Sequence, residues 1–311
     1  MKLLTYKHGE QPFRLGILVG NDHICDPQQA YMSMLFAGGQ LRASELSQAM
    51  LPSDPTEFLE TGDFAWDAAK QAIKYAEDCP GSSGVYSLSA VELGPPILRP
   101  KKIIAVGLNY RNHILEMGRD LPTHPVIFAK FSNTLLGPYS AFPWCSDLTK
   151  KLDYEGELAF VISRRAKRVP RERAFEYVAG YTIANDLSAR DLQKRTIQWL
   201  QGKSLDGSLP LGPYLVTRDE VADPHNLSLR VTVNGEERQR ATTSELVFGV
   251  DYLVSFLSHI MTLDPGDIVL TGTPGGVGEA RNVFLQDGDV VRVEIEKLGW
   301  IETRIEEVRE S

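Results

Sequence analysis

The sequence predicts a mixed α/β fold that is rich in strands. After Lys101, short apolar segments bounded by turn residues outnumber the helical patterns and do not alternate with them, which argues against a doubly wound parallel sheet. Before them, the proline-dense residues 95–100 cannot sustain a helix and are typical of an extended linker. We therefore expect a small N-terminal α+β domain over residues 1–95 and a larger catalytic domain over residues 96–311.

The first 95 residues predict a hairpin followed by helices. Two apolar segments, residues 13–19 and 23–26, flank a turn near residues 20–22. Helical patterns then cover residues 27–36 and 64–77.

Eight later segments have strand character: residues 103–108, 125–131, 157–163, 181–185, 212–217, 227–233, 267–271 and 289–296. Asn234-Gly235 directly after one of them is a strong signal for a two-residue hairpin turn. One long helix is expected over residues 244–262, where apolar residues recur at helical spacing and Glu245 lies in the first turn.

Composition excludes several classes of partner. The net charge of −8 argues against nucleic acid or an anionic membrane surface, and the basic residues 164–168 lack interleaved aromatics. The sequence shows no secretory signal, and no run approaches the ~18 apolar residues of a membrane span. Three widely spaced cysteines indicate a reducing compartment without disulfides or a zinc site. We expect a cytoplasmic protein with neither nucleic acid nor a membrane as partner.

Three carboxylates are placed where a divalent cation could bind them. Residues two apart on a strand face the same way, so Glu155 and Glu157 should project together, and Asp186 ends another apolar segment. Converging carboxylates need a proton or a cation, and an all-oxygen set favours Mg²⁺ or Mn²⁺ over zinc. The alternative is a solvent-facing pair, but five apolar residues follow it, and Gly156 is typical of a bulge or of close approach by a ligand.

A histidine and a glutamate follow the first strand of the larger domain. If residues 110–117 form a helical turn or two, His113 and Glu116 lie side by side at i and i+3. A carboxylate beside an imidazole raises the histidine's pKa and orients it, which suits a general base that activates water. A surface ion pair is the alternative interpretation.

Five blocks in order resemble the fumarylacetoacetate hydrolase superfamily: residues 106–116, 153–157, 185–193, 202–204 and 270–278. They extend over residues 101–300, and together with the 95-residue leading segment they look most like the bacterial branch of oxaloacetate decarboxylases and acylpyruvate hydrolases. The resemblance implies the family's mixed β-sandwich roll and a homodimer. It also implies that Glu155, Glu157 and Asp186 bind Mg²⁺ or Mn²⁺.

The same resemblance assigns roles to other residues. His113 and Glu116 match a water-activating dyad on a lid, and Lys203 matches a catalytic lysine beside the substrate oxygens. Four further matches are implied substrate-binding residues: Lys130, Arg190, Gln193 and Thr273.

One departure from the family pattern bears on the substrate. The eukaryotic members place an additional aspartate ligand before the dyad histidine, whereas residues 103–107 here contain no acid. Three protein ligands leave more positions open and favour a small 2-oxo acid as the substrate.

The resulting hypothesis is divalent-metal-dependent cleavage of a carbon–carbon bond next to a 2-oxo acid. Its main form is hydrolysis of an acylpyruvate through a metal-stabilised enolate and water activated by His113. The alternatives are an oxaloacetate decarboxylase, an isomerase or decarboxylase of an aromatic-catabolism intermediate, and a degenerate binding protein without activity.

Overall fold

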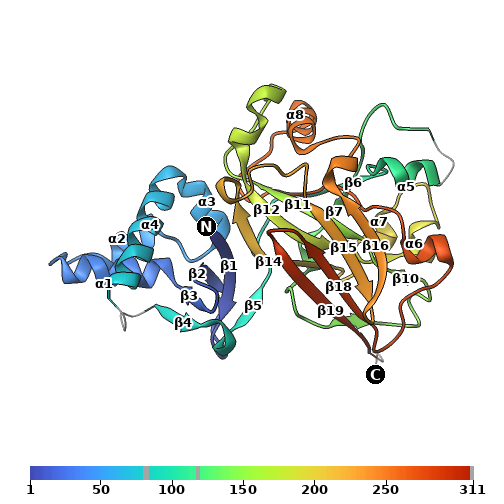
Figure 1. Ribbon diagram of the computed structural model, residues 1–311. Coiled ribbons are helices and arrows are strands. Elements are labelled where there is room, and N and C mark those ends of the chain that lie inside the picture. Colours follow the sequence, from blue (N-terminus) through green and yellow to red (C-terminus); the bar gives the residue numbers. More distant parts are fainter. Residues whose placement is uncertain (80–83, 117–119, 309–311) are drawn as a thin grey trace.

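The structure is a computed structural model that describes residues 1–79, 84–116 and 120–308 (Figure 1). The side chains of His113, Leu115 and Glu116 lie outside the described part.

The strands are β1 (Lys2–Lys7), β2 (Arg14–Val19), β3 (His23–Cys25), β4 (Val85–Ser87), β5 (Glu92–Gly94), β6 (Ile103–Gly107), β7 (Val126–Lys130), β8 (Leu135–Leu136), β9 (Phe142–Trp144), β10 (Leu152–Asp153), β11 (Gly156–Ile162), β12 (Val178–Asn185), β13 (Ser188–Ala189), β14 (Leu209–Thr217), β15 (Ser228–Val233), β16 (Glu236–Thr242), β17 (Ile268–Leu270), β18 (Val290–Ile295) and β19 (Gly299–Glu307). The helices are α1 (Pro27–Ala37), α2 (Ala43–Met50), α3 (Pro55–Thr61), α4 (Asp63–Asp78), α5 (Arg111–Glu116), α6 (Arg190–Gln193), α7 (Leu200–Lys203), α8 (Val250–Ile260) and α9 (Gly278–Arg281). The predicted strand-rich α/β class is confirmed.

One large sheet runs through most of the molecule. Its strands follow the order β4-β3-β2-β1-β14-β12-β11-β17-β6-β7, with β5 paired to β1 and β8 to β14. Because β1 pairs antiparallel with β14, the first strands extend the sheet of the larger part, while α1 and α2 project to one side (Figure 1). The division at residue 95 stays a prediction.

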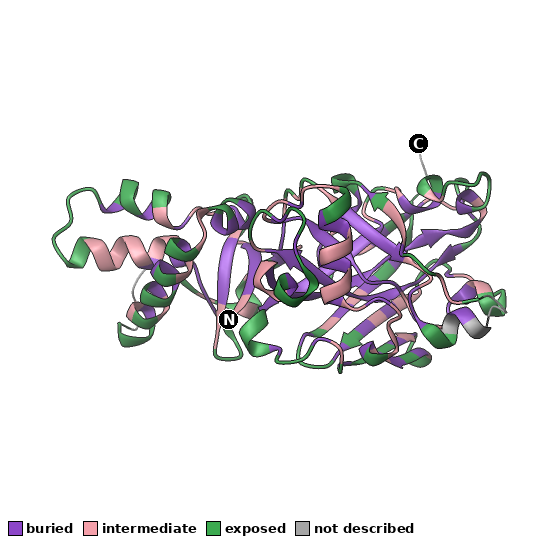
Figure 2. Ribbon diagram, turned by 90° about the horizontal axis from the view of Figure 1, so that it is seen from above, coloured by how far each residue is buried: buried purple, intermediate pink, exposed green. Residues whose placement is uncertain are grey.

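A second sheet, in the order β16-β15-β18-β19-β9, packs on one face of the large sheet. Leu158 and Phe160 of β11 share a core with Val231 and Val293 of this second sheet. The alternate residues of β11 belong to another core, which α3 and α4 help to form. Strand β11 is therefore buried on both faces, which explains its continuous apolar run. Figure 2 shows the contrast between the buried central strands and the outer helices, in which buried, intermediate and exposed residues alternate.

The eight predicted strands, the N-terminal hairpin and the hairpin at Asn234-Gly235 are all present. The helices predicted at 27–36 and 64–77 correspond to α1 and α4. The prediction did not include the strands β1, β4, β5, β8, β9, β10, β13 and β19 or the helices α2, α3, α6, α7 and α9.

The long helix predicted over residues 244–262 is wrong at its start. Residues 243–245 form a 3-10 turn, with a capping box between Thr242 and Glu245, and α8 begins only after Gly249. The amide of Val247 donates to the carbonyl of Asn109, and the amide of Phe248 donates to the Asn109 side chain. These tertiary hydrogen bonds hold residues 246–248 in a non-helical conformation. The apolar residues there are therefore spaced for burial and do not indicate a helix.

None of the helices in the described part of the chain combines the length and the apolar character needed to cross a membrane.

Candidate active site

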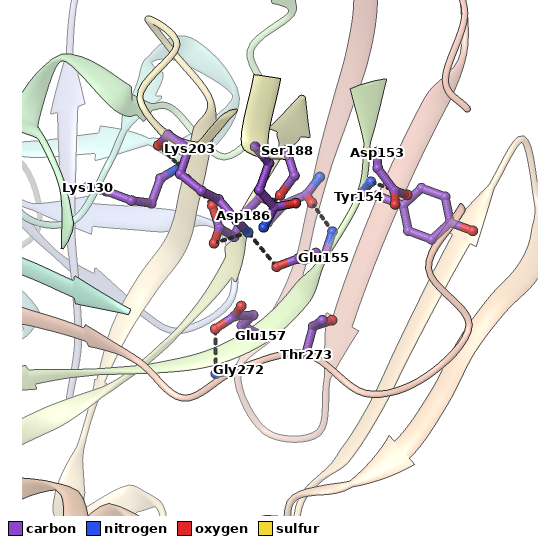
Figure 3. Close-up of polar contacts among 12 residues, drawn as sticks. Lys130, Asp153, Tyr154, Glu155, Glu157, Asp186, Ser188, Lys203, Gly272 and Thr273 are labelled. Atoms are coloured by element: carbon purple, nitrogen blue, oxygen red, sulfur yellow. Dashed lines mark hydrogen bonds and ion pairs between the residues drawn. The ribbon is translucent and has the colours of Figure 1, made fainter. Parts of the chain in front are cut away.

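Three carboxylates meet where β11 and β12 lie side by side. Glu155 directly precedes β11, Glu157 is its second residue, and Asp186 directly follows β12. The pairing of Gly156 with Asn185 brings them together, and the amide of Asp186 donates to the carbonyl of Glu155 at 2.8 Å. One carboxylate oxygen from each side chain lies within 4.8 Å of the others, and all three residues are buried (Figure 3).

Gly156 fixes how β11 sits between the two sheets. A Cβ atom on Gly156 would lie 2.3 Å from Cγ2 of Val231 and 3.0 Å from Cγ1 of Val293. The close approach expected at Gly156 is thus that of the second sheet and not that of a ligand. Since neighbouring residues of a strand face opposite ways, this packing turns Glu155 and Glu157 away from the second sheet.

Buried cations surround the triad. Nζ of Lys203 lies 2.7 Å from Oε2 of Glu155 and 2.7 Å from Oδ2 of Asp186. Arg190 pairs with the other oxygen of Glu155 at 2.6 Å, and Lys130 pairs with the other oxygen of Asp186 at 2.7 Å. Burial opposes ionisation of Glu155, but Lys203 and Arg190 outweigh it and lower the pKa of this carboxyl. Glu155 is therefore ionised and held in place by two buried cations.

Glu157 has the opposite electrostatic environment. Its Oε2 accepts a hydrogen bond from the amide of Gly272 at 2.6 Å. Burial, and then the charges of Asp186 and Glu155, raise its pKa well above the ordinary value. A divalent cation among these oxygens would take the place of the proton. The three carboxylates are hard oxygen donors, so the residues present fit Mg²⁺ or Mn²⁺.

Lys203 and Lys130 differ in position. Lys203 lines a cavity of about 450 Å³ that opens next to Glu155 and Glu157. Lys130 is not among the lining residues; its ammonium group is fully buried and donates to the carbonyl of Lys203 at 2.7 Å. Burial, more than any other cause, lowers the pKa of Lys130, whereas Asp186 and Glu155 outweigh burial and raise the pKa of Lys203. Direct substrate contact by Lys130 stays a prediction. In the structure, this residue forms an ion pair with Asp186 and does not line the cavity.

The cavity brings together most of the predicted site. Six of the predicted residues line it: Glu155, Glu157, Arg190, Gln193, Lys203 and Thr273. Nη1 of Arg190 donates to Oε1 of Gln193 at 3.1 Å, and the hydroxyl of Thr273 donates to the carbonyl of Gly156 at 3.0 Å. The remaining lining is largely apolar and includes Val106, Leu108, Phe128, Trp199 and Val277. The cavity thus has a charged side around Glu155 and Lys203 together with many apolar lining residues, and the ion pair of Lys194 with Glu279 lines it as well.

Asp153 was not predicted as a site residue, although it opens the second sequence block. It is fully buried, and its Oδ2 accepts from Nε of Arg190 at 2.8 Å. Its oxygens also accept from the amides of Gly278 at 2.7 Å and Glu279 at 3.0 Å. Asp153 therefore ties Arg190 to the loop that carries Thr273. Its place in the Asp-Tyr-Glu-Gly-Glu block was the one available signal.

Gln239 is a second residue that the sequence did not reveal. It is buried on β16, its Oε1 accepts from the amide of Gly156 at 3.0 Å, and its Nε2 donates to the Thr273 hydroxyl at 2.9 Å. It lies in a strongly polar strand of seven residues, and no local pattern distinguishes it from its solvent-facing neighbours.

The predicted dyad is only partly within the described structure. Residues 111–116 form α5, as the expected helical turn requires. The side chains of His113 and Glu116 lie outside the described residues, so the water-activating role stays a prediction.

Comparison with known proteins identifies the family. The family described as Fumarylacetoacetate (FAA) hydrolase C-terminal matches residues 102–306, which is well over half of the chain. The chain belongs to the fumarylacetoacetate hydrolase family. The predicted resemblance and the family fold are thereby confirmed.

Three individual relatives show which activities occur among similar proteins. The chain is 43% identical over 268 residues to the mitochondrial oxaloacetate tautomerase fahd2 of Xenopus laevis, covering 85% of this chain and 82% of that one. It is 39% identical over 298 residues to oxaloacetate tautomerase YisK of Bacillus subtilis, covering 94% and 95%. A solved structure of maleylpyruvate hydrolase from Sphingobium sp. SYK-6, in complex with manganese(II) ion and pyruvate, superposes with a TM-score of 0.74 at 27% identity, covering 99% of this chain and all of that one. These relatives include both tautomerases and a hydrolase.

Proposed function

We propose that the protein catalyses keto–enol tautomerisation of oxaloacetate, or of a closely similar small 2-oxo diacid, with Mg²⁺ or Mn²⁺ as cofactor. The observation that carries this proposal is the buried triad of Glu155, Glu157 and Asp186, with Lys203 beside it at the wall of a cavity. The similarity to oxaloacetate tautomerases over most of the chain supports the choice of substrate. It favours oxaloacetate, predicted from the sequence as the substrate of the alternative decarboxylase, over acylpyruvate hydrolysis, the main prediction; tautomerisation was not among the predicted reactions.

The chemistry needs stabilisation of negative charge on an oxygen. Tautomerisation moves a proton between the C3 carbon and the oxygen on C2, and the enolate form places charge on that oxygen. A divalent cation held by the triad would supply positive charge to the oxygens of the 2-oxo acid. Lys203 stays protonated because Asp186 and Glu155 raise its pKa, and its ammonium group can donate to the same oxygen.

Other residues position these groups. Arg190 is fixed by Asp153 and holds Glu155 in place, while Lys130 does the same for Asp186 from the side away from the cavity. Gln193 and Thr273 offer neutral polar contacts on the cavity wall. None of these tasks requires an attacking water. The reaction does need a group that takes the proton from C3 and returns it, and His113 supported by Glu116 is the predicted general base for that step.

Acylpyruvate hydrolysis is the second candidate. It is supported by the structural similarity to maleylpyruvate hydrolase, which was solved with manganese and pyruvate. The same charged side of the cavity would stabilise the enolate that leaves when the carbon–carbon bond breaks, but a nucleophilic water would also be needed. The homodimer and the cytoplasmic location stay predictions.

The test compares three reactions of the purified protein with Mg²⁺, with Mn²⁺ and with a chelator. Loss of enol-oxaloacetate absorbance reports tautomerisation, pyruvate formation reports decarboxylation, and acetylpyruvate consumption reports hydrolysis. We expect metal-dependent loss of the enol, reduced about 100-fold or more in Lys203→Met, because removing one donor to a developing oxyanion has an effect of that order. Metal-dependent hydrolysis of acetylpyruvate without faster enol loss would replace the proposal by the second candidate.

A further inference from the structure

Trp199 is the apolar side chain of the loop between α6 and α7 that lines the cavity, and the exposed Lys194 at the start of this loop lines it as well. Between α6 and α7, residues 194–198 and Leu200 are exposed, whereas Trp199 is half-buried. The neighbouring Ile197 is 94% exposed and does not line the cavity. The loop is thus anchored on the protein through its indole ring.

The indole is held between two strands. A Cβ atom on Gly107, the last residue of β6, would lie 2.5 Å from Cζ3 of Trp199, so the ring occupies the space that a side chain at Gly107 would fill. On β7, the Phe128 ring meets the indole edge-on, with 5.4 Å between centroids. The Phe128 ring centroid in turn lies 5.2 Å from Nζ of Lys203. Two fixed aromatic rings therefore form the apolar wall directly beside the lysine that contacts Glu155 and Asp186.

We propose that Trp199 is the specificity-determining residue that limits the size of the substrate beyond its reacting carbons. With Phe128 and Gly107 holding the indole, a four-carbon 2-oxo diacid fits beside Lys203, and a 2-oxo acid with an aromatic substituent meets the ring. This inference rests on the proposed function, because it takes the 2-oxo acid to bind at the triad. Truncation of Trp199 removes a large ring from the wall and leaves the charged side of the cavity intact.

The experiment measures kcat/KM of the Mn²⁺-loaded enzyme for enol-oxaloacetate and enol-phenylpyruvate in wild type, Trp199→Ala and Trp199→Phe. We expect Trp199→Ala to raise the ratio of phenylpyruvate to oxaloacetate activity by about 10-fold or more, which is the scale of discrimination by an apolar pocket wall. Trp199→Phe should lie between the two, and it preserves an aromatic ring should the alanine variant fold poorly. Ile197→Ala is the matched control on the same loop and should leave the ratio unchanged.

A binding measurement separates this inference from the proposed reaction. Calorimetric titration of the Mn²⁺-loaded proteins with oxalate and with phenylpyruvate gives dissociation constants that do not depend on turnover. If wild type shows no tautomerase activity, tighter phenylpyruvate binding in Trp199→Ala with unchanged oxalate binding still supports the size limit. A ratio of activities or affinities that stays within about twofold of wild type in both Trp199 variants would overturn it, as would the same change in Ile197→Ala.

Discussion

The two faces of strand β11 differ in their contribution to stability. On the face toward the second sheet, Gly156 packs so tightly against Val231 and Val293 that no Cβ fits without movement. On the other face, Glu155 and Glu157 are buried with Asp186, and the burial together with the two like charges raises the pKa of Glu157. One face favours the folded state, and the other stores repulsion that a bound cation relieves.

The difference shows how the fold supports a costly site. All seven residues of β11 are buried and its apolar residues belong to two cores, so the strand cannot shift easily to separate its carboxylates. Lys203 and Arg190 form ion pairs with Glu155 and offset its charge. Within the described part of the chain Glu157 has no such ion pair, so a proton or a cation must compensate its charge. Buried groups that are imperfectly compensated in the folded protein are characteristic of functional sites.

Among the substitutions, the largest expected effect on stability comes from the packed face. Gly156→Ala places a Cβ 2.3 Å from the stiff, buried Val231, so we expect a loss of about 1–3 kcal/mol in the free energy of unfolding. Denaturant unfolding measures it. The double variant Gly156→Ala/Val231→Ala removes the overlapping methyl group. It should therefore lose less unfolding free energy than the sum of the losses in the two single variants. Strict additivity would show that the contact with Val231 does not restrict residue 156.

A smaller change in stability, with a large loss of function, is expected on the charged face. Glu157→Gln replaces a carboxyl that favours its protonated form, so near pH 5 the unfolding free energy of the metal-free protein should change by only about 1 kcal/mol or less. Metal affinity and turnover should fall, with turnover reduced about 100-fold if the cation lowers the barrier by several kcal/mol. Calorimetric titration with Mn²⁺ and the enol-oxaloacetate assay measure both. Wild-type Mn²⁺ affinity in this variant would remove Glu157 from the ligand set.

The third effect is a dependence of stability on pH, which is small near pH 5 and accumulates with each pH unit above it. As pH rises above 4.5, Glu157 loses its proton in the unfolded chain while the folded, metal-free protein still retains it. The folded state is therefore destabilised with rising pH, by up to about 1.4 kcal/mol per unit, until the raised pKa is passed. Mn²⁺ should displace the proton, so its affinity should rise with pH over the same range.

Thermal unfolding from pH 5 to pH 8, with chelator and with Mn²⁺, measures this dependence. Titration in two buffers of different ionisation enthalpy counts the protons released by the metal. In Glu157→Gln the proton release should disappear, and an unchanged release would place the titrating group elsewhere.

Local sequence was enough to find the triad and most of the strands. The two-residue period of a strand placed Glu155 and Glu157 on one side, and Asp186 followed a second apolar segment. The family blocks then supplied Arg190, Gln193, Lys203 and Thr273, all of which line the cavity. These residues were accessible from the sequence because each lies beside a recognisable strand or motif.

Contacts between distant segments decided the rest. The start of α8 depends on Asn109, which lies about 140 residues earlier in the chain, and the position of Lys130 depends on Asp186. Asp153 acquires its role only when the loop of Gly278 reaches it, and Trp199 faces the cavity only because Gly107 leaves room for its ring. Hydrophobic periodicity and short motifs encode which face of an element is buried. Which partner lies across that face is set by tertiary packing, because the contacting atoms come from residues far apart in the chain.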